Sequence, residues 1–391
     1  MTSTLITNIG QLVTNDPTHD GTKLGLIKDA SLLIEDGVIA WAGSNADAPT
    51  HHIKKIIDAE GKCLLPGYVD SHTHMIFAGD RSNEFRARML GESYSAGGIT
   101  STVAKTRKAS NELLLTHAQF LLAEANAGGT TTIETKSGYG LTVKDERRSL
   151  EIAAQITEET TFLGAHVVPV EYKDSPKDYV DLVCGPMLDV VQPFAKWIDV
   201  FCDRGAFSVD DTRRILKAGI AKGLLPRLHA NQLEDGAGVQ LGVELGVASV
   251  DHVSHLSQED IEALSTSNTV ATLLPGAEFS TKSAYPDVRP LLEASITVAL
   301  ASDCNPGSSY TTSMAFIIAI AVREMHFSPE QAIWSATMGG AKALRRGDIG
   351  HLVEGARADF QILNAPSYIH LAYRPGVNLV EQVWRNGLQL I

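Results

Sequence analysis

The sequence predicts an α/β protein: a (β/α)8 TIM barrel with a small β-sandwich domain formed from the N- and C-terminal segments. Eight short apolar segments, each a strand candidate, alternate with longer amphipathic segments through the middle of the chain. Short β-like runs broken by Asp-Gly and Gly turns stand at both ends. With 391 residues, the chain can hold a barrel of ~250 residues and a second, smaller domain.

The terminal segments share one pattern. Residues 1–65 include LGLIKDASLLIEDGVIAWAG, in which apolar positions alternate and turns follow at Asp-Gly. The chain returns to this pattern near its end, in GDIGHLVEGARADFQILNA and VEQVWRNGLQLI. We therefore expect one composite domain of residues 1–65 plus 350–391 and a barrel of residues 66–349.

The barrel strands are expected in CLLPGYVDSH, TTTIETKSG, TTFLGAHVV, WIDVFCD, LLPRLHA, ASVDHVS, TVATLLP and TVALASD. The helix candidates are residues 101–127, 143–157, 209–222, 258–266 and 328–344. In this fold the active site lies at the C-terminal ends of the strands. Polar residues that directly follow these strands are therefore the candidates for function.

Composition excludes several classes of protein. The chain has 44% hydrophobic and 20% charged residues, as ordinary globular enzymes do. A net charge of -13 disfavours nucleic acid as a partner. The sequence has no stretch of 18 apolar residues, so we expect no membrane-spanning helix. The first residues, MTSTLITNIG, lack the basic start and apolar core of a signal peptide, and we expect a cytoplasmic protein.

The four cysteines, at positions 63, 184, 202 and 304, show no CxxC spacing. They are too few to form a disulfide framework in a chain of this length, so we expect reduced thiols. Cys304 follows Asp303 directly and could be considered a nucleophile. A small side chain packed beside the site is the favoured interpretation.

Metal-competent residues end four of the apolar segments. His72 and His74 are two apart, and side chains at that spacing leave the same face of a strand. His229, His252 and Asp303 each come directly after a short apolar segment. Two histidines alone could be hydrogen-bonded polar residues, but imidazole and carboxylate together are the ligands of a catalytic zinc or non-haem iron. The sequence therefore predicts a metal site.

Six motifs occur in an order that resembles the amidohydrolase superfamily: HTHMIFAGDRSNEF, ETKSGYGL, FLGAHVVP, LHANQL, VDHVSHL and SDCNPGSS. The chain is most similar to its imidazolonepropionase family, and the resemblance covers nearly the whole sequence. It implies hydrolysis of the ring C-N (cyclic amide) bond of 4-imidazolone-5-propanoate to N-formimidoyl-L-glutamate, a step of histidine degradation, by a metal-activated water. It also implies a cytoplasmic homodimer.

The resemblance implies one Zn²⁺ or Fe³⁺ per subunit, with the ligands His72, His74, His229 and Asp303. It implies that His252 is a nearby histidine that assists the chemistry. We expect Asp303, with His252 beside it, to accept the proton of the water, His252 to help stabilise the oxyanion, and Gln232 to form hydrogen bonds with the ring. A single ion is expected because dinuclear members have a carboxylated lysine at the end of strand four, whereas WIDVFCD has Lys196 just before its start. Deaminases of the superfamily usually have Glu where this chain has Gln232.

The implied substrate has a propionate and a small polar ring, so its pocket needs a cation and hydrogen-bonding groups. By resemblance, the substrate contacts come from eight residues: Arg81, Tyr94, Tyr139, His166, Gln232, Asn305, Gly307 and Ser308. From the residues alone, Arg81 could form a surface ion pair, Tyr139 could be a loop aromatic, and His166 could be a hydrogen-bonded core histidine.

Two alternatives stay open at this stage. One is a deaminase or cyclic amidase acting on another small heterocycle, since one fold supports many chemistries. The other is a non-catalytic scaffold that keeps the barrel without the metal. The sequence also leaves open the choice between zinc and iron, the oligomeric state and the preferred substrate enantiomer.

Overall fold

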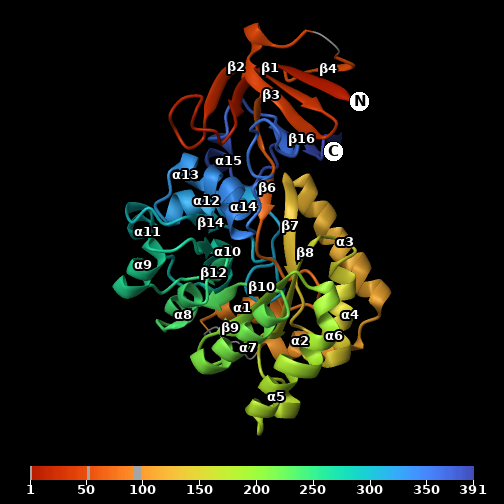
Figure 1. The fold of residues 1–391 in the computed structure, drawn as a ribbon, viewed down its shortest axis with the longest axis vertical. Helices are drawn as coiled ribbons and strands as arrows, with labels where there is room; N and C mark the ends of the chain where they lie inside the picture. The colour runs from red at the N-terminus through yellow and green to blue at the C-terminus, as the bar shows by residue number, and fades with distance from the viewer. Residues whose placement is uncertain (1, 51–52, 92–97) are drawn as a thin grey trace. The chain divides into compact units, whose positions relative to one another are not determined.

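The computed structural model describes residues 2–50, 53–91 and 98–391 (Figure 1). The chain divides into two compact units. One unit contains Met1–Asp70, Ala123–Thr132 and Ser313–Ile391, and the other contains Ser71–Leu122 and Ile133–Thr312. Tyr94, predicted to contact substrate, lies outside the described residues.

The first unit carries a mixed sheet in which strands from both ends of the chain pair. The strand order is β17-β16-β15-β5-β1-β2-β3, and β4 pairs with β1. Antiparallel pairing of β15 with β5 joins the two terminal segments, as predicted. The strands are β1 (Ser3–Val13), β2 (Leu26–Glu35), β3 (Val38–Ser44), β4 (Lys55–Asp58), β5 (Cys63–Pro66), β15 (Phe360–Leu363), β16 (Val380–Arg385) and β17 (Leu388–Gln389).

Local chemistry explains this sheet. The turn between β2 and β3 is Asp36-Gly37, with φ values of 46° and 88°, which a two-residue hairpin needs to match the twist of its strands. Inward-facing residues of both segments form one apolar cluster, including Leu32, Phe360 and Trp384. The rings of Phe360 and Trp384 stack with centroids 5.4 Å apart. The C-terminal segment thus completes a core that the N-terminal segment begins.

The second sheet is a near-closed parallel barrel, which confirms the predicted fold class. Its eight principal strands follow one another in chain order, and the short β10 (Leu225–Pro226) pairs with β9. Every residue of β7, β8 and β9 is buried, as expected for parallel strands covered on both faces. The strands are β6 (Tyr68–Asp70), β7 (Thr130–Lys136), β8 (Glu159–Ala165), β9 (Trp197–Cys202), β11 (Leu228–Ala230), β12 (Ser249–His252), β13 (Val270–Leu273) and β14 (Val298–Leu300).

The barrel closes where the chain leaves its first and last strands. Thr73 and Cys304 form a parallel bridge. The His72 carbonyl accepts a hydrogen bond from the Asp303 amide at 3.0 Å, and the His74 amide donates to the Cys304 carbonyl at 2.9 Å. Residues far apart in the sequence therefore meet at the C-terminal ends of the strands.

The helices are α1 (Ser82–Met89), α2 (Ile99–Lys108), α3 (Asn111–Ala127), α4 (Val143–Ala153), α5 (Pro176–Leu182), α6 (Leu188–Val191), α7 (Val209–Ala221), α8 (Gly238–Glu244), α9 (Gln258–Ser265), α10 (Pro275–Thr281), α11 (Arg289–Glu293), α12 (Met314–Glu324), α13 (Pro329–Trp334), α14 (Gly340–Ala343) and α15 (His370–Tyr373). Several begin at a hydroxyl cap, as α9 does at Ser257, whose Oγ accepts from the Asp260 amide at 3.2 Å. Within the described ranges, no helix is long and apolar enough to cross a membrane.

Two predicted helices are wrong in detail. The helix expected over 101–127 is two helices, because Ala109 is extended and the Ser110 hydroxyl accepts from the Leu113 amide at 3.1 Å at the start of α3. The helix expected over 328–344 contains a wider turn at Ser335–Gly339 between α13 and α14. The helices expected over 209–222 and 258–266 are confirmed as α7 and α9.

Candidate metal centre and substrate pocket

Four buried side chains from three parts of the barrel converge on one point. His72 and His74 follow β6, His229 lies in β11, and Asp303 follows β14. The Nε2 atom of His74 lies 3.3 Å from that of His72 and 3.4 Å from that of His229. The Oδ1 atom of Asp303 lies 3.7 Å from His72 Nε2 and 3.6 Å from His74 Nε2.

This spacing fits a single ion. Nitrogen ligands ~2.0–2.1 Å from one ion at tetrahedral angles stand ~3.3–3.4 Å apart, and the Nε2 atom of His74 stands at these distances from those of His72 and His229. Burial lowers the pKa values of His72, His74 and His229 well below the usual value, which keeps these rings neutral, the form that binds a metal. Burial raises the pKa of Asp303 well above its usual value, and a bound cation would offset that effect. Such a buried His/Asp cluster is typical of the metal sites of amidohydrolases.

Two carboxylates orient the histidines. Asp251 Oδ2 lies 2.7 Å from His72 Nδ1, and Asp199 Oδ2 lies 3.0 Å from His229 Nδ1. A carboxylate at Nδ1 favours the tautomer with its hydrogen there and leaves Nε2 free to coordinate. The sequence analysis did not identify Asp199 or Asp251.

A buried ionic network lies around these carboxylates. Lys136 Nζ lies 2.9 Å from Glu134 Oε1 and 3.3 Å from Asp199 Oδ2, and Arg227 Nη2 donates to Asp251 Oδ2 at 2.9 Å. All these side chains are fully buried. Together with Asp303, the network has four carboxylates against two cationic side chains. A divalent cation would balance that difference.

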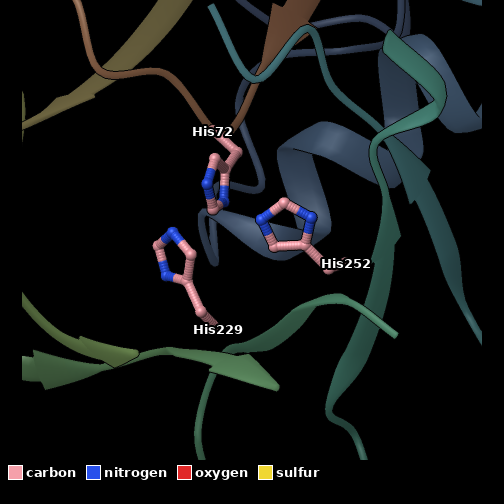
Figure 2. A group of neighbouring side chains, drawn as sticks. All are labelled: His72, His229 and His252. Atoms are coloured by element: carbon pink, nitrogen blue, oxygen red, sulfur yellow. The ribbon is translucent and has the colours of Figure 1, made fainter. Parts of the chain in front are cut away.

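His252 ends β12 beside the cluster, and Figure 2 shows its ring together with those of His72 and His229. Its ring centroid lies 5.4 Å from that of His229 and 5.7 Å from that of His72. These three histidines also form a group whose nitrogen atoms lie within 4.8 Å of one another. Burial lowers the pKa of His252 to about 4, so the ring is neutral at pH 7.

A pocket lined mainly by polar side chains opens over the cluster. Arg81 is buried in its wall, and its Nη2 lies 2.6 Å from Glu84 Oε2. Tyr139 is also buried there, while Tyr94 is outside the described residues and Gly307 is not among the lining residues. The lining residues are His74, Arg81, Ile99, Tyr139, His166, His229, Gln232, His252, Asp303, Asn305 and Ser308.

His166 presents a hydrogen-bond acceptor to this pocket. Its Nδ1 atom lies 3.0 Å from the Gly138 carbonyl, which accepts a hydrogen bond, so Nδ1 carries the hydrogen and Nε2 is the acceptor. Burial lowers the pKa of His166 to about 4, which keeps the ring neutral at pH 7. The ring stacks on that of His74 with centroids 5.4 Å apart.

The loop after β14 is organised by Asn305. Its Oδ1 atom accepts from the amides of Gly307 and Ser308, both at 2.8 Å, and its Nδ2 donates to the Asp303 carbonyl at 2.7 Å. Gly307 lies against Arg81, because a Cβ atom there would stand 2.2 Å from Arg81 Nη1. Glycine at this position therefore leaves room for the end of the Arg81 side chain beside the pocket.

In the described part of the chain, neither Lys196 nor a cysteine belongs to the metal cluster. Lys196 lies before β9 and is 2.7 Å from Glu159 Oε1, away from the strand's C-terminal end. Cys63, Cys184, Cys202 and Cys304 are free thiols, as expected. Cys304 is fully buried, which agrees with a packing role.

Comparisons with known proteins show the family of the chain. The amidohydrolase family pattern matches residues 215–388. The imidazolonepropionase of Mycolicibacterium smegmatis is 62% identical over 387 residues, covering 99% of this chain and 97% of that protein. That of Salinispora tropica is 61% identical over 390 residues, covering 99% of each chain.

Solved structures share the fold at much lower identity. Atrazine chlorohydrolase from Arthrobacter aurescens, solved in complex with zinc, has a TM-score of 0.72 at 17% identity, covering 99% of this chain and 95% of that one. Ochratoxinase from A. niger has a TM-score of 0.70 at 19% identity, with the same coverage. Similarity of fold does not identify a family, but sequence identity near 60% over the whole length does. The chain belongs to the imidazolonepropionase family of the amidohydrolases.

Proposed function

We propose that this pocket opens the ring of 4-imidazolone-5-propanoate at a single metal ion held by His72, His74, His229 and Asp303. Imidazolonepropionase activity follows from family membership. The observation that supports the ligand assignment is the spacing of the Nε2 atoms, 3.3 and 3.4 Å, with Asp303 Oδ1 beside them. The product is N-formimidoyl-L-glutamate.

The side chains supply the proton transfers. A bound ion lowers the pKa of water from 15.7 toward ~7 and polarises a carbonyl. Asp303 takes the proton from the attacking water and later gives the same proton to the ring nitrogen as the C-N bond breaks. His252, which is neutral at pH 7, has one N–H that can donate to the oxyanion developing on the ring carbonyl.

The remaining pocket residues bind the substrate. The Arg81 guanidinium pairs with the propionate, and His166 Nε2 accepts a hydrogen bond from a ring N–H. Gln232 both donates and accepts at the ring edge, and the hydroxyl of Tyr139 adds a further contact. Asn305 and Ser308 complete the wall beside Arg81. Gly307, in the same loop, and Tyr94 remain proposed contacts.

Glu146 is expected to support this binding surface. It is fully buried and accepts from the amides of Gly140 at 2.9 Å and Leu141 at 2.7 Å, and from that of Gly138. Replacing Glu146 with Gln puts an NH₂ group against one of these donors. KM should rise about tenfold, the equivalent of ~1.4 kcal/mol, because Tyr139 loses its fixed loop. Steady-state kinetics will measure this.

Glu151→Gln is the matched control for that substitution, since Glu151 lies in the same helix, α4, and forms a surface pair with Arg147. Its KM should equal that of the wild type. Equal KM values for the two variants would show that the Glu146 hydrogen bonds do not govern substrate binding.

The test of the proposed function combines metal analysis with product analysis. Purified protein should hold one ion per chain, and turnover should rise in proportion to occupancy when chelated protein is reloaded. Loss of the substrate's ultraviolet absorption should be accompanied by formimidoylglutamate and no ammonia. Two ions per chain in active protein would contradict the mononuclear site, and ammonia release would indicate a deaminase instead.

Three further expectations belong to this proposal. The ion is zinc or iron, since three histidines and an aspartate suit either. The protein acts in the cytoplasm as a homodimer. The domain limits stay at residues 1–65 plus 350–391 for the composite β domain and 66–349 for the barrel.

A further inference from the structure

A partly buried hydrogen bond lies next to His252 and has no role in the function proposed above. The Ser254 hydroxyl donates to Glu278 Oε1 at 2.5 Å. Glu278 lies in α10, which follows β13. That strand runs between β12, which ends at His252, and β14, which is followed by Asp303. Glu278 therefore belongs to the rim of the barrel between two residues of the proposed mechanism.

Among the described residues, the ring of His252 has no carboxylate beside its Nδ1 atom, whereas the rings of His72 and His229 do. His72 has Asp251 at its Nδ1 atom, and His229 has Asp199. The Nδ1 atom of His252 is buried without a hydrogen-bond partner among residues 2–50, 53–91 and 98–391. The orientation of this ring must therefore depend on the backbone that carries it.

That backbone is strained. His252 has φ of 75° and Val253 has φ of 44°, and for a β-branched residue such as Val253 a positive φ is a genuine outlier. Each such conformation costs ~1–3 kcal/mol and persists only where the surroundings hold it. A released turn would relax and rotate the His252 ring away from the pocket.

The turn is held from two sides. On the side of β11, the Val253 amide donates to the Ala230 carbonyl at 3.1 Å, and the His255 amide donates to the Asn231 carbonyl at 3.0 Å. On the side of β13, the Ser254–Glu278 hydrogen bond is the side-chain contact that holds it. The two sets of bonds bracket the strained residues.

Stability alone does not explain Glu278. The residue is 4% exposed, and in the described part of the chain its Oε2 atom has no hydrogen-bond partner. Burying a carboxyl group with so few partners is costly. A function in the site, through the hydrogen bond from Ser254, would account for a carboxyl group in this costly position.

We propose that Glu278 is a positioning residue: through the Ser254 hydroxyl it fixes the strained His252–Val253 turn, and thereby the orientation of the His252 ring. This inference rests on the proposed role of His252. It adds a residue that acts through Ser254, and that residue lies in α10, which follows the strand between those of His252 and Asp303.

The test compares Ser254→Ala, Glu278→Met and Glu278→Gln. The first two remove the hydrogen bond, so kcat should fall about tenfold while KM changes by less than about twofold, as expected when a catalytic group is misplaced without loss of binding. Glu278→Gln keeps an acceptor for Ser254 and should retain kcat within about threefold of the wild type. All three should keep one ion per chain by metal analysis.

The Ser254→Ala/Glu278→Met double variant should lose no more than either single variant, because both break one interaction. Unchanged kcat in Ser254→Ala, or a loss in Glu278→Gln as large as in Glu278→Met, overturns the inference. His252→Phe assayed alongside separates the two proposals. If it is impaired while Ser254→Ala is not, the proposed function stands and the positioning role fails. If it turns over normally, the role of His252 fails.

Discussion

His252→Phe is expected to lower kcat by about 10²- to 10³-fold, the loss usual when one donor to an oxyanion is removed. The substitution removes the ring N–H that donates to the oxyanion and leaves a ring of similar size in the buried position at the end of β12. Metal content should not change, because His72, His74, His229 and Asp303 are untouched. Steady-state kinetics on metal-replete protein will measure the effect.

His255→Phe is the matched control. His255 stands three residues further along the same turn, and its side chain is exposed. That variant should keep wild-type kcat. If His252→Phe instead loses the ion, His252 is a ligand, as its place within 4.8 Å of His72 and His229 would also permit.

Lys136→Met is expected to destabilise the barrel by ~3–5 kcal/mol, since removing one partner of a buried ion pair leaves uncompensated charge. Lys136 is fully buried, with Glu134 Oε1 at 2.9 Å and Asp199 Oδ2 at 3.3 Å. The methionine side chain fills the space but cannot balance either carboxylate. Urea unfolding followed by circular dichroism will give the change in the free energy of unfolding.

Two further variants make that experiment specific. Lys222→Met breaks a half-exposed pair with Asp189 and should leave stability nearly unchanged. Adding Glu134→Gln to Lys136→Met removes one of the unbalanced carboxylates and should restore part of the lost stability. A Lys136→Met protein as stable as the wild type would mean that the network carries little net energy.

The sequence was sufficient to predict the barrel and the converging residues because both depend on local patterns. Each metal-competent residue directly follows a short apolar segment, and strands of a parallel barrel end at one rim. The break at Ser110 was missed because the apolar residues on either side keep a helical spacing. The cap that starts α3 became visible only through its hydrogen bond to Leu113.

The charges beneath the cluster could not be assigned from sequence in the same way. Glu134 and Lys136 are two apart in β7 and so share a face, which was a usable signal. Arg227 has the same spacing from His229 but lies between β10 and β11. Their partners come from neighbouring strands, as Asp199 does for Lys136, and pairing across strands depends on register. Burial of Glu278 likewise depends on how α10 returns over β13.

The closure of the barrel has a consequence for how this enzyme is assembled. The amide of Asp303 bonds to the carbonyl of His72, so two proposed ligands lie on opposite sides of the join between the first and eighth strands. During synthesis His72 emerges early, but the ion has no complete set of ligands until residue 303 has been made. An ion that binds only the joined state stabilises the closed barrel by mass action. A bound ion would therefore stabilise the closed barrel as well as serve the reaction, in addition to the backbone hydrogen bonds that join the two ends of the sheet.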